Sequence, residues 1–115
     1  MSKNDPVRLR HMLDAALEAI SFAEEQTRAD LDADRKLNLS LVRLIEIIGE
    51  AADQISANTQ ERHADIPWAD IIGMRHRLIH GYSDVDLDIV WQVVTKDLPP
   101  LVAALEKILR SDNDA

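Results

Sequence analysis

LVRLIEIIGEAADQI, residues 41–55, is the stretch that decides the fold. Its apolar residues recur every three or four positions, which is the period of one face of an α-helix. One stripe is formed by Leu41, Leu44, Ile45, Ile48, Ala52 and Ile55, widened by Ile47 and Ala51. The pattern predicts a long helix over about 34–57. Gly49 stands inside it, where glycine costs about 1 kcal/mol relative to alanine, so we expect a neighbouring helix to approach closely there.

Helical signals continue towards the N-terminus. Asp5 precedes Pro6, a typical helix start, and the apolar spacing that follows predicts a first helix over about 6–28. Between the second and third helices, residues 58–65 form a polar connection in which we expect one short helical turn.

Two further helices are predicted towards the C-terminus. The third spans about 68–80 and is ended by Gly81. The fourth begins at a capping residue, Asp86 or Asp88, and is kinked or interrupted by the prolines at 99–100 before its apolar stripe continues.

The composition supports the same fold class. The chain has 115 residues, of which 46% are hydrophobic and 30% charged, with three glycines and four prolines. This leaves little material for the turns of a β-sandwich. We therefore expect one all-α domain over 1–115, a bundle of four to five helices with its core at about 6–110 and a frayed tail over 111–115.

Composition also excludes several functions. The absence of cysteine excludes disulfides, thiolate zinc sites and cysteine nucleophiles. Charges interrupt the N-terminus, and no apolar run approaches the ~20 residues of a membrane span, so we expect a cytoplasmic protein without contact to a membrane. A net charge of -8 counts against general nucleic-acid binding, and four aromatic residues are too few for a base-stacking platform. Any binding to nucleic acid must then be confined to a local part of the protein surface.

Residues 75–82, RHRLIHGY, form a basic segment in this acidic chain. On a helical wheel Arg75 falls between two groups of apolar residues, so its guanidinium needs a carboxylate partner, a polar cleft or a subunit interface. His80 follows five residues later, roughly 140° around an ideal helix. The two side chains converge if Arg75 reaches along the surface, if the helix unwinds near Gly81, or if a second subunit completes the site. Equally, Arg75 can be a structural ion-pair partner and His80 a helix cap.

Two metal sites are weaker interpretations of nearby residues. His76 and His80 have the spacing of a helical zinc pair, but Arg77 stands where a metalloprotease has glutamate. The acidic residues at 84, 86 and 88 alternate like a calcium loop, without its glycine or its final glutamate. We expect helix caps and turn residues there, and no metal.

The basic segment resembles a family motif. Arg75, four residues, His80, one residue and Tyr82 match the RX4HXY motif of HEPN-domain toxins of the HepT-like type. The likeness extends to flanking stretches, which are EIIGEAA (46–52), DIPW (65–68), IIGMR (71–75), VDLDIVW (85–91) and DLPP (97–100). It covers about residues 6–110.

The resemblance implies an all-α HEPN-like bundle that forms a homodimer, with two motifs facing each other across a cleft. It implies the toxin of a type VII-like toxin–antitoxin system, a metal-independent endoribonuclease that acts on RNA without a cofactor. Arg75 and His80 would be catalytic, and His76 and Arg77 would support the site or bind substrate. Tyr82 would receive AMP from an MntA-like nucleotidyltransferase, the antitoxin, and this modification would silence the toxin.

These residues suit RNA cleavage. His80 can take the proton of a 2′-OH that attacks the adjacent phosphorus, while Arg75 neutralises charge on the phosphoryl oxygens. Two other classes stay open. A non-catalytic module would use Arg75, Arg77 and His76 to hold a nucleotide or to dock the nucleotidyltransferase, and a purely structural bundle would leave Arg75 unexplained.

Overall fold

The computed structural model describes residues 1–81 and 84–114, with side chains described as far as Ser111. In chain order the helices of this part are α1 (Asp5–Ala23), α2 (Arg28–Ala33), α3 (Arg35–Asp53), α4 (Ala57–Arg62), α5 (Trp68–Ile72), α6 (Met74–Leu78), α7 (Leu87–Gln92), the π-helical η1 (Val93–Asp97) and α8 (Leu98–Asp114). The all-α class is confirmed. The frayed tail over 111–115 stays a prediction.

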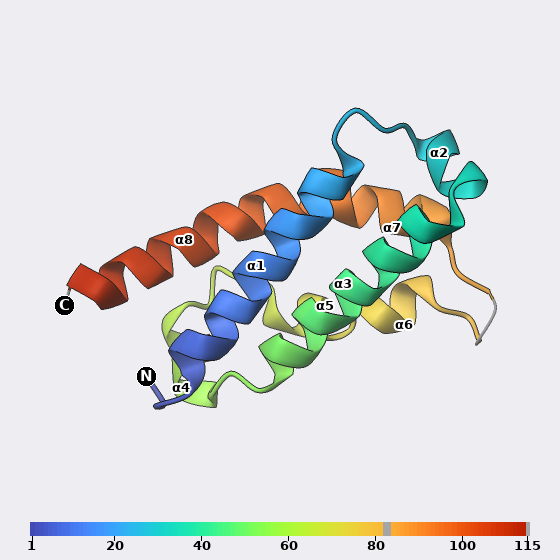
Figure 1. Ribbon diagram of the computed structural model, residues 1–115. Coiled ribbons are helices and arrows are strands. Elements are labelled where there is room, and N and C mark those ends of the chain that lie inside the picture. The colour runs from blue at the N-terminus through green and yellow to red at the C-terminus, as the bar shows by residue number, and fades with distance from the viewer. Residues whose placement is uncertain (82–83, 115) are drawn as a thin grey trace.

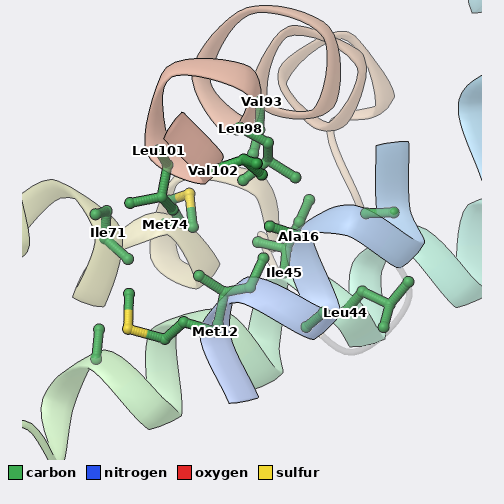
Figure 2. Packing of buried hydrophobic residues seen from close by; sticks show 14 of the residues in the cluster. Met12, Ala16, Leu44, Ile45, Ile71, Met74, Val93, Leu98, Leu101 and Val102 are labelled. Atoms are coloured by element: carbon green, nitrogen blue, oxygen red, sulfur yellow. The ribbon is translucent and has the colours of Figure 1, made fainter. Parts of the chain in front are cut away.

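The long helices α1, α3 and α8 build the core. α1 packs against both α3 and α8, as Figure 1 shows. Met12 and Ala16 of α1, Ile45 of α3 and Leu98 of α8 are fully buried at its centre, part of which is drawn in Figure 2. Seven of the eight residues in the apolar stripe predicted on 41–55 lie in the core, and Ile47 is half-buried. All of them except Ile55, which follows the end of α3, belong to this helix.

Gly49 is a point of close approach between α3 and α5. A Cβ atom there would lie 3.1 Å from the carbonyl oxygen of Ile71 and 3.5 Å from that of Ile72. Both atoms belong to the backbone and cannot rotate away. The close approach expected from the sequence is confirmed.

The predicted third helix is broken. Gly73 separates α5 from α6, and α6 ends at Leu78 instead of His80. The chain then turns back on itself. Ile79 pairs with Val85, and the N–H of His80 donates to the carbonyl oxygen of Asp84 at 2.7 Å. Gly81, with φ +118°, therefore serves this turn and does not end the helix.

Two aspartates cap the N-terminal ends of other helices through side-chain hydrogen bonds. Asp34 accepts a hydrogen bond from the N–H of Leu37 at the start of α3. Asp86 accepts from the N–H groups of Asp88 and Ile89 at the start of α7, which confirms one of the two expected caps.

The double proline changes the helix type without ending the helix. Pro99 and Pro100 have no N–H, so they cannot continue the α-helical ladder towards η1. The N–H of Leu98 donates instead to the carbonyl oxygen of Val93, five residues earlier, which is the π-helical pattern. α7, η1 and α8 thus follow one another without a break.

The buried carboxylate of Asp5 connects the N-terminal end of α1 to the start of α4. Asp5 is fully buried and accepts hydrogen bonds from the N–H of Ser2, from the N–H and the hydroxyl of Ser56, and from the hydroxyl of Thr59, at 2.6–3.0 Å. Burial raises the pKa of Asp5, but these hydrogen bonds outweigh it and lower the pKa to about 2. Asp5 therefore ties α1 to α4, and Asn4 occupies the N-cap position.

Candidate active site

Arg75 makes an ion pair with a residue of α3. Its Nε donates to Oε2 of Glu46 at 3.1 Å, and the two side chains are 54% and 21% exposed. The carboxylate partner expected for Arg75 thus exists. Glu46 was not singled out as a site residue by sequence reasoning, because the pair joins positions 29 apart and depends on how α3 and α6 pack.

The side chain of Arg75 does not point into an apolar stripe, and that expectation is wrong. The helical wheel assumed one continuous helix over 68–80, whereas Gly73 separates α5 from α6. On the short α6, Met74 and Leu78 face the core, and Arg75 lies on the surface beside α3.

Glu46 orients the guanidinium of Arg75 by binding one of its edges. Within the described residues its hydrogen bond to Glu46 uses Nε, and no other bond of this side chain is formed. As far as the described residues go, the two terminal nitrogens have no hydrogen-bond partner and can contact an anion. A planar cation held in this way can contact two oxygens of one phosphate group.

His80 lies just beyond the end of α6, directly after the helical turn that begins at Arg75. The N–H of Ile79 donates to the carbonyl oxygen of Arg75 at 3.0 Å, and His80 is the next residue. Its backbone is held by the bond to Asp84, while its side chain is exposed. The helix thus unwinds between Arg75 and His80, one of the three ways in which the two residues can converge, and does so earlier than expected.

The other residues of the motif lie in different places. His76 is exposed on α6. Arg77 lines a cleft between α5–α6 and η1–α8 and follows Arg75 by two positions, which is about 200° around a helix. The structure does not bring Arg77 to the side of α6 where Arg75 contacts Glu46. Tyr82 lies outside the described residues, so its assignment as the modified residue stays a prediction.

The geometry gives no support to a metal site in the described part of the chain, where no three candidate ligands come together. His76 lies in α6 and His80 beyond its end, so the spacing of a helical zinc pair is lost. Asp86 caps α7, and Asp88 accepts from Nε of Arg28 at 2.6 Å. This hydrogen bond to Asp88 is the main cause that raises the pKa of Arg28.

The all-α bundle with its RX4HXY segment defines a HEPN-like protein. Residues 12–108 match the ribonuclease HepT-like family. The chain is 38% identical over 100 residues to a Thermococcus cleftensis protein named "Probable ribonuclease HepT", which covers 84% of this chain and 91% of that protein. It is 34% identical over 107 residues to a candidate RNase of Caldanaerobacter subterraneus, over 90% and 96% of the two chains.

A third relative, a candidate RNase of Methanocaldococcus jannaschii, is 30% identical over 92% of this chain and 98% of its own length. No solved structure gave a significant match. The chain belongs to the ribonuclease HepT-like family. Among its described helices, none has both the length and the apolar character to cross a membrane.

Proposed function

We propose that the chain is a metal-independent endoribonuclease and the toxin of a toxin–antitoxin pair. The observation that carries the proposal is the geometry of the motif. Glu46 holds one edge of the Arg75 guanidinium and leaves the other edge open, and His80 is exposed just after the same helical turn. Membership of the ribonuclease HepT-like family supports RNA as the substrate.

His80 is the general base in the proposed reaction. It takes the proton of a ribose 2′-OH, whose oxygen forms a bond to the adjacent phosphorus, and the bond from phosphorus to the 5′-oxygen breaks. The 5′-oxygen takes up a proton from water, so the products are a 2′,3′-cyclic phosphate and a 5′-OH end. Arg75 neutralises the charge that grows on the phosphoryl oxygens. DNA has no 2′-OH and is not cleaved.

A homodimer completes the site in this proposal. Arg75 and His80 both lie on the surface of a single chain, so they leave one side of a bound phosphate open to solvent. A two-fold interface would place a second copy of the motif opposite the first. Gel filtration with light scattering tests this arrangement directly.

The nuclease is tested by incubating the purified full chain with total cellular RNA and mapping the cleaved ends. We expect discrete products with cyclic phosphate ends, and no cleavage of DNA of the same sequence. Products with 3′-OH ends, or equal cleavage of DNA, would contradict the proposed chemistry.

Chelation is expected to leave cleavage unchanged, because the proposed base and cation are both side chains. The measurement is the cleavage rate before and after dialysis against EDTA. Activity lost and restored by zinc would favour a site at His76 and His80. Activity restored by magnesium would implicate the acidic residues at 84–88.

Glu46→Gln is expected to lower kcat by about tenfold, because a neutral amide fixes the guanidinium less firmly, and tenfold corresponds to about 1.4 kcal/mol. Stability should change little, since a pair this exposed contributes about 1 kcal/mol or less. Glu50→Gln is the matched control. Glu50 lies one turn further along α3, pairs with Arg43 at 3.7 Å and makes no ion pair with Arg75. Equal effects of both variants on kcat would contradict a positioning role for Glu46.

Tyr82→Phe is expected to escape silencing by the antitoxin. The proposed nucleotidyltransferase transfers AMP from ATP to the only phenol in the chain, and the adduct adds a charged, bulky group beside the site. The variant keeps the ring and lacks the acceptor oxygen. Mass spectrometry after incubation with the enzyme, ATP and magnesium decides the point. AMP on another residue, or on the variant as well, would rule the mechanism out.

A further inference from the structure

The motif histidine belongs to a short antiparallel ladder that follows α6. Ile79 and Val85 are the bridge pair of this ladder. One residue further towards the turn, the N–H of His80 donates to the carbonyl oxygen of Asp84 at 2.7 Å. In an antiparallel pair the residues on either side of a bridge also lie opposite each other, so Asp84 is the residue that lies across from His80.

The side chains of His80 and Asp84 share one face of this ladder. Successive residues of an extended segment point to opposite faces, whereas residues that lie across from each other point to the same face. Burial agrees with this pattern, because Ile79 and Val85 are half-buried and pack against the core. His80 and Asp84 are exposed. The imidazole and the carboxylate are therefore neighbours on the solvent side.

The two side chains are within reach of each other. The Cβ atoms of residues paired in this way are about 5 Å apart. Rotation of both side chains can then bring a carboxylate oxygen of Asp84 within hydrogen-bond distance of the ring of His80. Nδ1 is the ring nitrogen nearer to the backbone, so it is the one that the short aspartate side chain reaches. Nε2, on the far side of the ring, remains available to a substrate.

Three other acidic residues around the motif already have partners. Glu46 accepts from Nε of Arg75 at 3.1 Å. Asp86 caps α7, and Asp88 makes an ion pair with α2. Among the residues that the structure describes, the carboxylate of Asp84 takes part in no ion pair. It is thus the carboxylate of this region whose position favours a contact with the motif histidine.

We propose that Asp84 is a positioning residue for His80. Its carboxylate accepts a hydrogen bond from Nδ1–H, which holds the imidazole in one orientation and leaves the lone pair on Nε2. Nε2 takes the proton of the ribose 2′-OH, and the carboxylate stabilises the imidazolium that this transfer creates. The inference rests on the proposed function, in which His80 is the general base.

Asp84→Ala in the full-length chain is expected to lower kcat for RNA cleavage about five- to tenfold and to leave KM unchanged, a moderate effect because water screens an exposed pair. Asp84→Asn keeps an oxygen that can accept from Nδ1–H but carries no charge, so its kcat should be intermediate. Asp14→Ala removes an exposed carboxylate from α1 and is the matched control for net charge. It should behave as wild type.

A spectroscopic measurement separates positioning from a merely structural effect. Nitrogen-15 NMR of labelled histidines distinguishes the Nδ1–H from the Nε2–H tautomer at alkaline pH, where imidazole is neutral. We expect mainly the Nδ1–H tautomer for His80 in the wild type and a shift towards Nε2–H in Asp84→Ala. The signals of His76, which is exposed on α6, should be the same in both proteins.

Several outcomes would overturn the positioning role. A wild-type kcat in Asp84→Ala, or an unchanged His80 tautomer, would do so. An equal loss of kcat in Asp14→Ala would assign the effect to net charge, and a raised KM at constant kcat would assign it to RNA binding. Circular dichroism checks folding. Asp84→Asn, which keeps the size of the side chain, carries the same test if the alanine variant does not fold.

The nuclease can fail separately from this contact. If the wild-type chain cleaves no RNA while His80 changes its tautomer in Asp84→Ala, the proposed function is wrong and the contact stands. If the wild-type chain cleaves RNA and neither kcat nor the His80 tautomer responds to Asp84→Ala, the positioning role is wrong and the nuclease stands.

Discussion

RNA cleavage is expected to fall by about 10²- to 10⁴-fold when His80 is replaced by alanine, because the proposed reaction loses its general base. Arg75→Ala should lower the rate by about 10²- to 10³-fold through loss of the charge that stabilises the phosphoryl oxygens. Both side chains are exposed, so the bundle should stay folded. The measurement is single-turnover cleavage of a defined RNA, with circular dichroism as the check on folding.

Two further variants serve as controls for this pair. Arg43→Ala removes an arginine of α3 whose ion pair, to Glu50, is independent of the motif, and it should leave the rate unchanged. Arg75→Lys keeps the charge but cannot contact Glu46 and a phosphate through one planar group, so a partial rate is expected. Full activity in His80→Ala or in Arg75→Ala would refute the assignment of the active site.

Asp5→Ala is expected to lower the free energy of unfolding by about 2–4 kcal/mol, because it leaves the buried hydroxyl of Thr59 and the N–H of Ser56 without their charged acceptor. Asp14→Ala, on an exposed position of the same helix, is the matched control and should have little effect. Urea unfolding at neutral pH measures both. Equal midpoints for Asp5→Ala and wild type would contradict the structural role of this network.

Acid should remove the same stabilisation. The pKa of Asp5 falls from 3.8 to about 2 on folding, and each pKa unit is worth about 1.4 kcal/mol, so ionised Asp5 stabilises the fold by about 2 kcal/mol. Because the folded pKa is the lower one, this contribution is complete above about pH 4 and is lost as the pH falls towards 2. Asp5→Asn should unfold with a shallower pH dependence across this window.

The long helices could be predicted from sequence because each buries a regular stripe. The periodicity of residues 41–55 located α3, and it also gave the close approach at Gly49. α2 was missed because its six residues contain Leu31 as their only large apolar residue, too few for a periodic signal. Its place depends on tertiary contacts, including the ion pair from Arg28 to Asp88 of α7.

The residues of the proposed site could be identified from the sequence, but their geometry could not. The motif located Arg75 and His80 in the sequence, yet the wheel drawn through them failed because Gly73 breaks the helix and α6 ends at Leu78. Neither the pairing of Arg75 with Glu46 nor the separation of Arg77 from Arg75 follows from spacing alone. Both depend on how α5 and α6 pack against α3, and the close backbone approach at Gly49 is part of that packing.

Because α6 is short, the basic motif can lose its ordered structure at a lower free energy than the whole fold needs to unfold. With five residues, Met74–Leu78, the helix has few internal hydrogen bonds, because the first four N–H groups of any helix lack an internal partner. Its attachment comes mainly from the buried side chains of Met74 and Leu78. We therefore expect α6 to open locally, and its amide hydrogens to exchange with solvent, at a lower free energy than those in the middle of α3. A partner that binds the motif can then reshape it without unfolding the core.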